Sequence, residues 1–215
     1  MSKIISIEGN IGSGKSTLLR ELNTYFKDNN DIIFLEEPVS HWENIKDCDG
    51  NTILKKFYED QKKYSFAFQM MAYISRLSIL KDAIKNHPNA IIITERCLNT
   101  DRYVFAKMLY DGGLLEDVEY QIYTNWFDHF NDIANIQKIV YLKTDPTICA
   151  HRINKRNRSG ESSISIDYLT KCHEYHEDMV NKMIDNSLII NADIDCDDNN
   201  LRHIWIEDIE KFIQL

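Results

Sequence analysis

The chain has 215 residues, enough for one sizeable hydrophobic core, and we expect a single domain over residues 1–215. Its formal net charge of −9 argues against nucleic acid or an anionic membrane as a partner. Five scattered cysteines without a C-x-x-C pair, no signal-peptide core and no apolar run of membrane-spanning length predict free thiols in a cytoplasmic protein.

Short apolar runs alternate with helical patterns along the whole chain. Five runs rich in β-branched residues are typical of strands covered on both faces: Ile4–Ile7, Ile32–Leu35, Ala90–Thr94, Lys138–Leu142 and Leu188–Asn191. Helical periodicity fills the gaps, over residues 18–26, 66–84, 116–130, from 146 onward, 166–184 and 201–212. The alternation predicts an α/β fold in three layers, a five-stranded parallel sheet flanked by helices. Ligands of such sheets bind at the carboxyl ends of the strands.

A phosphate-binding loop follows the first strand. Residues 9–16 fit G-x-x-x-x-G-K-[ST], in the strand and helix context that this motif requires. Lys15 should reach the β- and γ-phosphates, and the Ser16 hydroxyl can hold Mg²⁺. GTP-switch motifs find no match in a suitable context, which favours ATP. We expect ATP to be bound by Gly9, Asn10, Ile11, Gly12, Ser13, Gly14, Lys15, Ser16 and Thr17.

Acidic residues follow the second and third strands. Glu37, just before a proline, is placed to take a proton from an acceptor hydroxyl. Side chains alternate along a strand, so the neighbouring Glu36 is expected to be a solvated charge. Glu95 ends the third strand beside the phosphate loop and suits Mg²⁺, held directly or through water. Arg152 and Arg156 share one helix face, which predicts neutralisation of a transferring phosphate.

Six ordered segments span nearly the whole chain: IEGNIGSGKST, EEPVSHW, FYEDQKKYSFAFQ, ERCLNTDRYVFA, HRINKRNRSGE and the helix beginning near IDYL. Together they resemble the deoxynucleoside kinases of the deoxycytidine, deoxyguanosine and insect multisubstrate type. The resemblance implies a P-loop kinase fold with an arginine-rich lid over about residues 152–163. It also implies transfer of the γ-phosphate of ATP, with Mg²⁺, to the 5′-hydroxyl of a deoxynucleoside, and a homodimer built on helices near residues 66–84 and 116–130.

The same resemblance implies roles for individual residues. Glu37 resembles the general base for the 5′-hydroxyl, and Arg96 the arginine that contacts this base and the hydroxyl. The remaining implied contacts are Trp42 and Phe105 as walls around the nucleobase, Gln69 on the base edge, Tyr58 and Glu161 on the sugar 3′-hydroxyl, and Arg152, Arg156 and Arg158 in the lid over the transferred phosphate. Cys97 departs from the family, which usually has serine there, and Ser159-Gly160 stands in a lid stretch that is often more polar.

Arg76 and Asp101 bear on the choice of nucleoside. Family members acting on deoxycytidine and purine deoxynucleosides carry this pair, with a small residue at the place of Ala72. The resemblance therefore implies that these substrates are favoured over thymidine. Physically, a buried arginine–aspartate pair can exchange hydrogen bonds with a base and leaves little apolar room for the thymine methyl group. A purely structural ion pair stays open as an alternative.

Two other readings of the chain are weaker. A thymidylate kinase shares the phosphate loop, D-R-Y and E-P, but its acceptor is a phosphate, and glycines rather than Val39-Ser40-His41-Trp42 would follow E-P. A non-enzymatic ATP-binding regulatory module would not need the acceptor set from Glu37 to Glu161. Residues 193–199 resemble the start of a calcium loop but lack its glycine, so we expect a solvated loop near the adenine.

Overall fold

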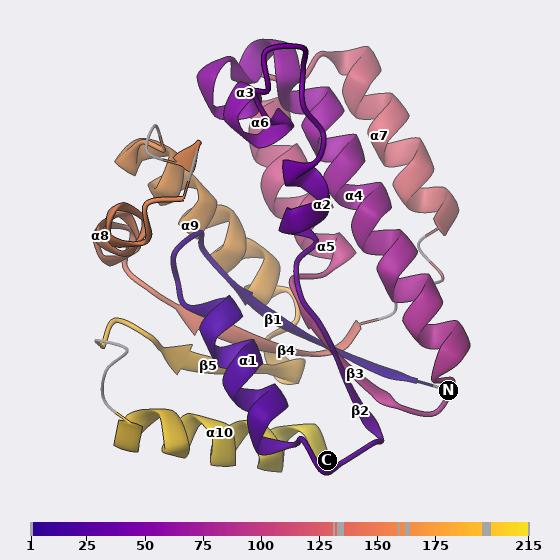
Figure 1. Cartoon of the computed structure of the whole chain (residues 1–215), viewed down its shortest axis with the longest axis vertical. Coiled ribbons are helices and arrows are strands. Elements are labelled where there is room, and N and C mark those ends of the chain that lie inside the picture. Colours follow the sequence, from indigo (N-terminus) through magenta and orange to yellow (C-terminus); the bar gives the residue numbers. More distant parts are fainter. Residues whose placement is uncertain are drawn as a thin grey trace.

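The computed structural model describes residues 2–130, 132, 136–158, 160–161, 164–194 and 199–214. At its centre lies a five-stranded sheet of order β2-β3-β1-β4-β5, in which every pairing is parallel (Figure 1). The strands are β1 (Lys3–Gly9), β2 (Ile32–Leu35), β3 (Ile91–Glu95), β4 (Ile136–Lys143) and β5 (Ser187–Asn191). The predicted five-stranded parallel sheet is confirmed, with each strand within a few residues of its expected place.

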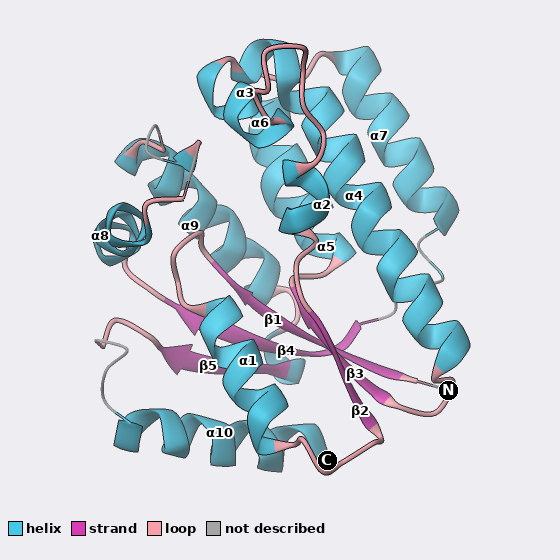
Figure 2. Ribbon diagram, in the orientation of Figure 1, coloured by secondary structure: helices cyan, strands magenta, loops and turns pink. Residues whose placement is uncertain are grey.

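Helices cover both faces of the sheet, as the predicted three-layer fold requires (Figure 2). On one face, α1 (Lys15–Tyr25) and α10 (Asn199–Gln214) share a core with Ile5 and Ile7 of β1. On the other face, α4 (Gln61–Asn86), α7 (Asp117–Phe130) and α9 (Ile166–Asn181) share a core with Ile4. Successive residues of β1 therefore point to opposite layers, the period expected of a strand buried on both sides.

The long helix α4 has clear local causes at both ends. The Asp60 side chain accepts a hydrogen bond from the backbone N–H of Lys63 at 3.2 Å, which caps the first turn. At the other end the helix stops at Asn86, two positions before Pro88, because a residue that precedes proline is disfavoured in the helical conformation. This helix carries Gln69 and Arg76, so its fixed ends also fix two of the expected site residues.

Several short helices escape the sequence patterns because they are too brief to show a helical period. They are α2 (Val39–Glu43), α3 (Ile53–Glu59), α5 (Leu98–Thr100), a π-helix (Asp101–Ala106) and α6 (Lys107–Asp111). The helix α8 (Pro146–Arg156) begins where expected, with Asp145 as its N-terminal cap. The helix α9 ends at Asn181 rather than 184, and a 3-10 turn (Ile184–Asn186) leads into β5.

Four of the five cysteines lie in the described part of the chain, and none of the four is in a disulfide. Cys48, Cys97, Cys149 and Cys172 carry free thiols, as predicted, and Cys196 lies outside the described residues. Within the described ranges, no helix combines the length and the apolar character needed to cross a membrane. Residues 195–198 of the calcium-like loop are likewise outside the described part of the chain.

Candidate active site

A cavity of about 600 Å³ opens at the carboxyl ends of β1, β2 and β3. In Figure 1, α2, α3, α4 and α7 rise on one side of these strand ends, and α8 and α9 lie on the other. The structure brings nearly all the expected site residues into the lining of this cavity. Gly9, Asn10 and Ser13 are the expected residues that do not line it, and Asn10 and Ser13 are buried behind the phosphate loop.

The phosphate loop approaches neighbouring backbone too closely for side chains at two of its glycines. Gly12 has a positive φ of 81°, and a Cβ there would lie 2.7 Å from the carbonyl oxygen of Cys149 in α8. Gly9 has a φ of 145°, and its Cβ would lie 2.7 Å from the carbonyl oxygen of Leu142. Glycine is therefore required at both positions for the loop to pack against β4 and α8. The loop and the helix that carries the lid arginines touch directly.

Lys15 lies in the first turn of α1 and is buried, with its Nζ donating to the carbonyl oxygen of Asn10 at 2.7 Å. Burial and the nearby Arg96 lower the pKa of Lys15, Glu95 and Glu37 oppose this, and the resulting pKa is about 8. The ammonium group is therefore mostly charged at neutral pH but close to losing its proton. An added phosphate would favour the charged form.

The two expected metal ligands lie next to each other. The Ser16 hydroxyl donates to Oε1 of Glu95 at 2.7 Å, at the edge of the phosphate loop. Mg²⁺ prefers oxygen ligands and usually combines one or two protein groups with phosphate oxygens and water. A hydroxyl and a carboxylate beside a phosphate-binding loop fit that requirement.

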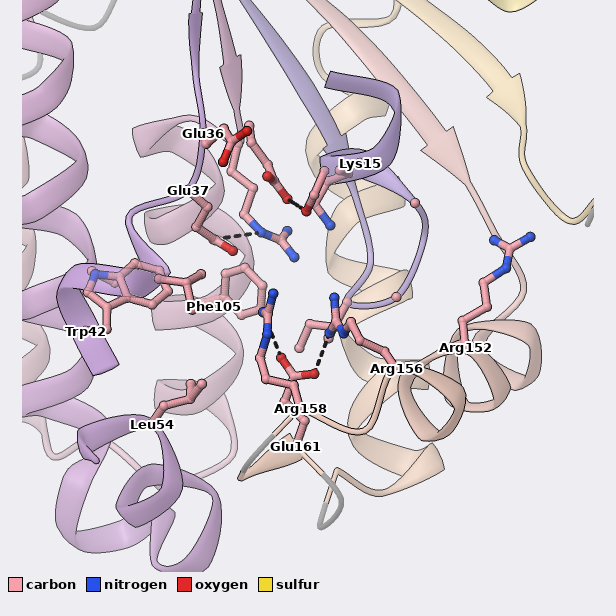
Figure 3. A pocket seen from close by; sticks show the side chains of 18 of the residues that line it. Lys15, Glu36, Glu37, Trp42, Leu54, Phe105, Arg152, Arg156, Arg158 and Glu161 are labelled. Carbon is pink, nitrogen blue, oxygen red and sulfur yellow. Dashed lines mark hydrogen bonds and ion pairs between the residues drawn. The ribbon is translucent and has the colours of Figure 1, made fainter. Parts of the chain in front are cut away.

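Glu37 follows β2 and points into the cavity (Figure 3), where Arg76 and Arg96 hold its carboxylate. Its Oε1 accepts from Nη2 of Arg76 at 2.9 Å and lies 3.4 Å from Nε of Arg96. Burial alone would raise the pKa of Glu37, but Arg76, Arg96 and Lys15 outweigh it and lower the pKa to about 2. The carboxylate is therefore ionised throughout the physiological pH range. The neighbouring Glu36 is exposed at the rim, as predicted for a solvated charge.

Arg76 joins the expected base to the expected specificity pair. Its Nε donates to Oδ2 of Asp101 at 2.9 Å, and its Nη1 donates to the carbonyl oxygen of Glu95 at 2.8 Å. Burial would lower the pKa of Arg76, but Asp101 and Glu37 outweigh it and raise the pKa. The guanidinium group therefore stays charged and ties α4 to the ends of β2 and β3 and to the π-helix.

Arg96 stands at the end of β3 in an unusual backbone conformation. Its φ is 62°, in the left-handed region that non-glycine residues rarely occupy. Its Nη1 donates to the carbonyl oxygen of Gly9 at 2.9 Å and lies 3.2 Å from Nε2 of His176. Its guanidinium carbon also sits 4.8 Å from the centre of the Phe105 ring. The side chain is thus fixed on several sides and turned toward Glu37.

Aromatic rings line the part of the cavity beside Glu37. Trp42 packs edge-on against Phe68, with ring centres 5.6 Å apart, and Phe57 stacks on Phe68 at 4.5 Å. Phe105 enters from the π-helix, which also carries Asp101. Gln69 is buried, and its Oε1 has no hydrogen-bond partner among the described residues. The pocket combines flat apolar walls with one unmatched acceptor and a charged pair, which suits a planar polar ring.

The lid arginines divide into two groups (Figure 3). Arg156 and Arg158 both pair with Glu161, the latter at 3.2 Å between Nη1 and Oε1. Arg152 points away from this cluster, and its Nη2 donates to the carbonyl oxygen of Ile194, after β5, at 2.7 Å. Within the expected lid, residues 159, 162 and 163 lie outside the described part of the chain.

Tyr58 and Glu161 come from opposite sides of the cavity. Burial, and to a smaller extent Glu161, raise the pKa of the Tyr58 hydroxyl. That hydroxyl therefore remains protonated and able to donate. The two side chains face the same space from α3 and from the segment after α8.

Other lining residues were not expected from the sequence. They are Arg20, Val39, Ser40, Leu54, Phe57, Phe68, His151, Lys155 and Tyr168. Leu54 and Phe57 belong to α3, which the periodicity did not reveal, and Phe68 belongs to α4, where its apolar side chain is typical of core. His176, which contacts Arg96, was also missed because it lies on the apolar face of α9 together with Leu169 and Cys172.

Comparisons with known proteins identify the family of the chain. The family described as deoxynucleoside kinase matches residues 5–214 of the chain. The probable deoxycytidine kinase of fowlpox virus is 36% identical over 220 residues, covering 98% of this chain and 88% of that protein. Human deoxycytidine kinase is 34% identical over 195 residues, covering 81% and 74%. The mitochondrial deoxyguanosine kinase of Xenopus laevis is 32% identical over 198 residues, covering 84% and 74%.

Proposed function

Because the chain belongs to the deoxynucleoside kinase family, we propose that it transfers the γ-phosphate of ATP to the 5′-hydroxyl of a deoxynucleoside in nucleotide salvage. The observation that carries this proposal is Glu37, an ionised carboxylate held 2.9 Å from Arg76 and facing the same cavity as Lys15. A carboxylate in that position can accept the proton of an acceptor hydroxyl. A thymidylate kinase needs no base for a hydroxyl, because its acceptor is already a phosphate. The similar proteins named above are deoxynucleoside kinases, which also argues against a thymidylate kinase.

In the proposed reaction Glu37 accepts the proton of the 5′-hydroxyl as the oxygen attacks the γ-phosphorus. Arg96, 3.4 Å from Glu37, holds the carboxylate and the hydroxyl in place. Lys15 and the lid arginines Arg156 and Arg158 stabilise the negative charge on the transferring group. The leaving ADP takes over the bond electrons, and no covalent enzyme intermediate is needed.

Mg²⁺ is the proposed companion of ATP, with the Ser16 hydroxyl and the Glu95 carboxylate as its protein ligands. Their oxygens lie 2.7 Å apart beside the phosphate loop. When bound, the ion neutralises phosphate charge. The chain's own contribution there is to hold these two oxygens at the start of α1, where the helix N-terminus also favours anions.

We propose that deoxycytidine and purine deoxynucleosides are favoured over thymidine. The buried pair of Arg76 and Asp101 faces the cavity beside Ala72, and Gln69 offers an acceptor that lacks a partner among the described residues. Polar groups of this kind match an amino-bearing base better than a methyl group. Trp42 and Phe105 would enclose the ring. The similar proteins named above are deoxycytidine and deoxyguanosine kinases, which supports the same preference.

The lid is proposed to serve both substrates. Arg156 and Arg158 would act on the transferred phosphate, and Glu161 with Tyr58 on the sugar 3′-hydroxyl. Arg152 instead donates to the carbonyl oxygen of Ile194, after β5, and we propose that it acts on the donor nucleotide rather than on the transferred phosphate. This assignment refines the expectation that all three arginines act on one group.

We also propose a homodimer built on α4 and α7. These helices carry large exposed apolar side chains, among them Ile74, Val118, Ile122 and Trp126. The two helices pack against each other, and exposed apolar side chains on neighbouring helices suit an interface between copies. Size-exclusion chromatography with light scattering measures the mass of the protein in solution. The mass of a single chain at micromolar concentration would contradict the dimer.

The proposed function is tested by steady-state assays with ATP and Mg²⁺. Deoxycytidine, deoxyadenosine, deoxyguanosine, thymidine and thymidine monophosphate are each supplied as the only acceptor. We expect phosphorylation of the first three, with thymidine poor. A preference for thymidine would support the proposed reaction but contradict the proposed choice of nucleoside. Activity on the monophosphate alone would remove Glu37 as the base.

A further inference from the structure

His176 is a buried histidine of α9 to which the proposed reaction gives no role. Its side chain is 0% exposed, and it lies opposite Arg96, at the carboxyl end of β3. A histidine on an apolar helix face is usually a core residue with a satisfied hydrogen bond. Here, however, its two ring nitrogens contact two different polar groups. Nδ1 lies 2.6 Å from the carbonyl oxygen of Cys172, and Nε2 lies 3.2 Å from Nη1 of Arg96.

These two partners fix where the proton of the ring sits. The carbonyl oxygen of Cys172 can only accept a hydrogen bond, so Nδ1 must carry the hydrogen. The guanidinium group of Arg96 can only donate, so Nε2 must offer its lone pair. The ring is therefore a neutral imidazole in one defined tautomer. A protonated ring would instead turn an N–H toward a cation.

The surroundings keep the ring neutral. Burial and, after it, the charge of Arg96 lower the pKa of His176 well below its ordinary value, and together they outweigh the carbonyl oxygen of Cys172, which raises it. The acceptor on Nε2 is therefore available over the whole pH range of an enzyme assay.

The Arg96 guanidinium needs such an acceptor. Its backbone is in a strained left-handed conformation, and its Nη1 is shared between the carbonyl oxygen of Gly9 and His176. The His176 ring also meets Phe105 edge-on, with ring centres 5.9 Å apart, and Phe105 lies against Arg96. These contacts hold the far end of the guanidinium group, which leaves Nε facing Glu37 at 3.4 Å.

We propose that His176 is a positioning residue for phosphoryl transfer: it accepts a hydrogen bond from Arg96 and so aims this arginine at Glu37 and the acceptor hydroxyl. The proposal rests on the proposed function, because Arg96 matters only if Glu37 serves a hydroxyl. It gives His176 no contact with substrate. Its effect should therefore appear mainly in kcat, because the part of Arg96 that it positions faces Glu37 and the acceptor hydroxyl.

The test uses substitutions that separate the two ring nitrogens. In His176→Gln the amide oxygen lies the same number of bonds from the backbone as Nε2, so the acceptor for Arg96 is kept. In His176→Asn the amide lies at the distance of Nδ1, so the contact with Cys172 is kept and the acceptor is lost. His176→Leu removes both. His173→Leu, one turn earlier on α9 and without a contact to Arg96 in the described structure, is the matched control.

We expect kcat to fall about 10- to 100-fold in His176→Leu and His176→Asn, the effect of losing one hydrogen bond to a charged group. His176→Gln should recover most of this loss, and the KM for ATP should change little in all three. In an Arg96→Ala background, followed by single-turnover assays with excess enzyme, the same substitutions should have almost no further effect, since residues that act through one another are not additive.

The outcomes separate the proposal from its premise. Wild-type protein that phosphorylates no deoxynucleoside would remove the proposed function itself. If the wild-type protein is active, three results would overturn the role of His176. They are an unchanged kcat in His176→Asn, equal losses of kcat in His176→Asn and His176→Gln, and losses that add fully to that of Arg96→Ala. If His176→Leu does not fold, the comparison of Asn with Gln decides alone.

Discussion

The acceptor side of the cavity and the lid both present arginines to the same space, but they hold them differently. Arg76 and Arg96 are 8% and 4% exposed, and each is fixed by partners from several elements. Arg156 and Arg158 are 35% and 30% exposed, and both pair with the single carboxylate of Glu161. The first pair belongs to the folded core, and the second can exchange Glu161 for another anion.

This difference indicates when the acceptor side and the lid each reach the geometry that the reaction needs. Buried charges must be matched before any substrate arrives, because an unmatched buried charge is strongly destabilising. The lid arginines are partly exposed to solvent and share the buried carboxylate of Glu161, so either arginine can leave for another anion while the other still matches that carboxylate. The acceptor side is therefore arranged in advance, whereas the lid depends on its ligand. Substitutions should reveal this as a different balance between lost activity and lost stability.

The largest effect should come from the lid. Arg156→Ala should lower kcat on the order of a thousandfold or more, because it removes a positive charge that would stabilise the transferring phosphoryl group. The free energy of unfolding should fall by less than about 1 kcal/mol, because Arg156 is partly exposed and the buried Glu161 keeps Arg158 as its partner. Steady-state kinetics and urea unfolding measure the two quantities. Arg202→Ala is the matched control, since Arg202 pairs with Glu21 away from the cavity. A large loss of stability in Arg156→Ala would break the comparison.

Glu37→Gln should lower kcat by about a hundred- to ten-thousandfold, the usual contribution of a general base, while ATP binding persists. It should also destabilise the fold by about 1–3 kcal/mol at neutral pH, because Arg96 loses its paired carboxylate and Arg76 keeps only that of Asp101. Glu36→Gln, one residue earlier and exposed, is the control.

The stability effect of Glu37 has a defined dependence on pH. The folded pKa of Glu37 is lowered from 4.5 to about 2, so its contribution is fully present above the unfolded pKa and is lost as the pH falls toward about 2. The difference between wild type and Glu37→Gln should therefore shrink in urea titrations at progressively lower pH. A constant difference would show that Glu37 is not held as an ion by its neighbours.

Asp101→Asn should reduce the ratio of kcat/KM for deoxycytidine over thymidine about tenfold, because the base loses one arm of a charged pair. Competition assays with both nucleosides measure this ratio. If the ratio is unchanged and only stability falls, Asp101 and Arg76 form a structural ion pair, the alternative that the sequence left open.

The smallest effect concerns Lys15. Its pKa of about 8 means that the free protein loses this charge as the pH rises through that value. The KM for ATP should therefore be nearly constant from about pH 6 to 7.5 and rise several-fold by about pH 9. The KM for the nucleoside should not follow the same curve. A flat ATP profile would place Lys15 outside phosphate binding.

The parts of this structure that repeat over many residues could be predicted from sequence. The five strands, the long helices and the phosphate loop follow from apolar periodicity and from glycine spacing, and the family suggested by six ordered segments is confirmed over residues 5–214. Most of the expected side chains do line one cavity.

What could not be predicted depends on contacts between distant segments. The helices α2 and α3 are too short to show a period, so Leu54 and Phe57 were not expected in the cavity. The partner of Arg152 is a carbonyl oxygen 42 residues away, which no local pattern encodes. His176 follows the apolar spacing of α9, and its tautomer and its contact with Arg96 exist only once β3 lies beside that helix.

The π-helix Asp101–Ala106 has a consequence for how the pocket could diverge between related enzymes. Its backbone hydrogen bonds span five residues instead of the four of an α-helix, and the segment brings both Asp101 and Phe105 to the cavity. Deleting a single residue between Asp101 and Phe105 would let the segment close as an α-helix and would bring these two side chains one residue closer in sequence, a step that corresponds to about 100° around an α-helix. The aromatic wall would then rotate away while the strand that carries Glu95 stayed in place. One insertion or deletion can therefore reshape base selection here without disturbing the chemistry beside it.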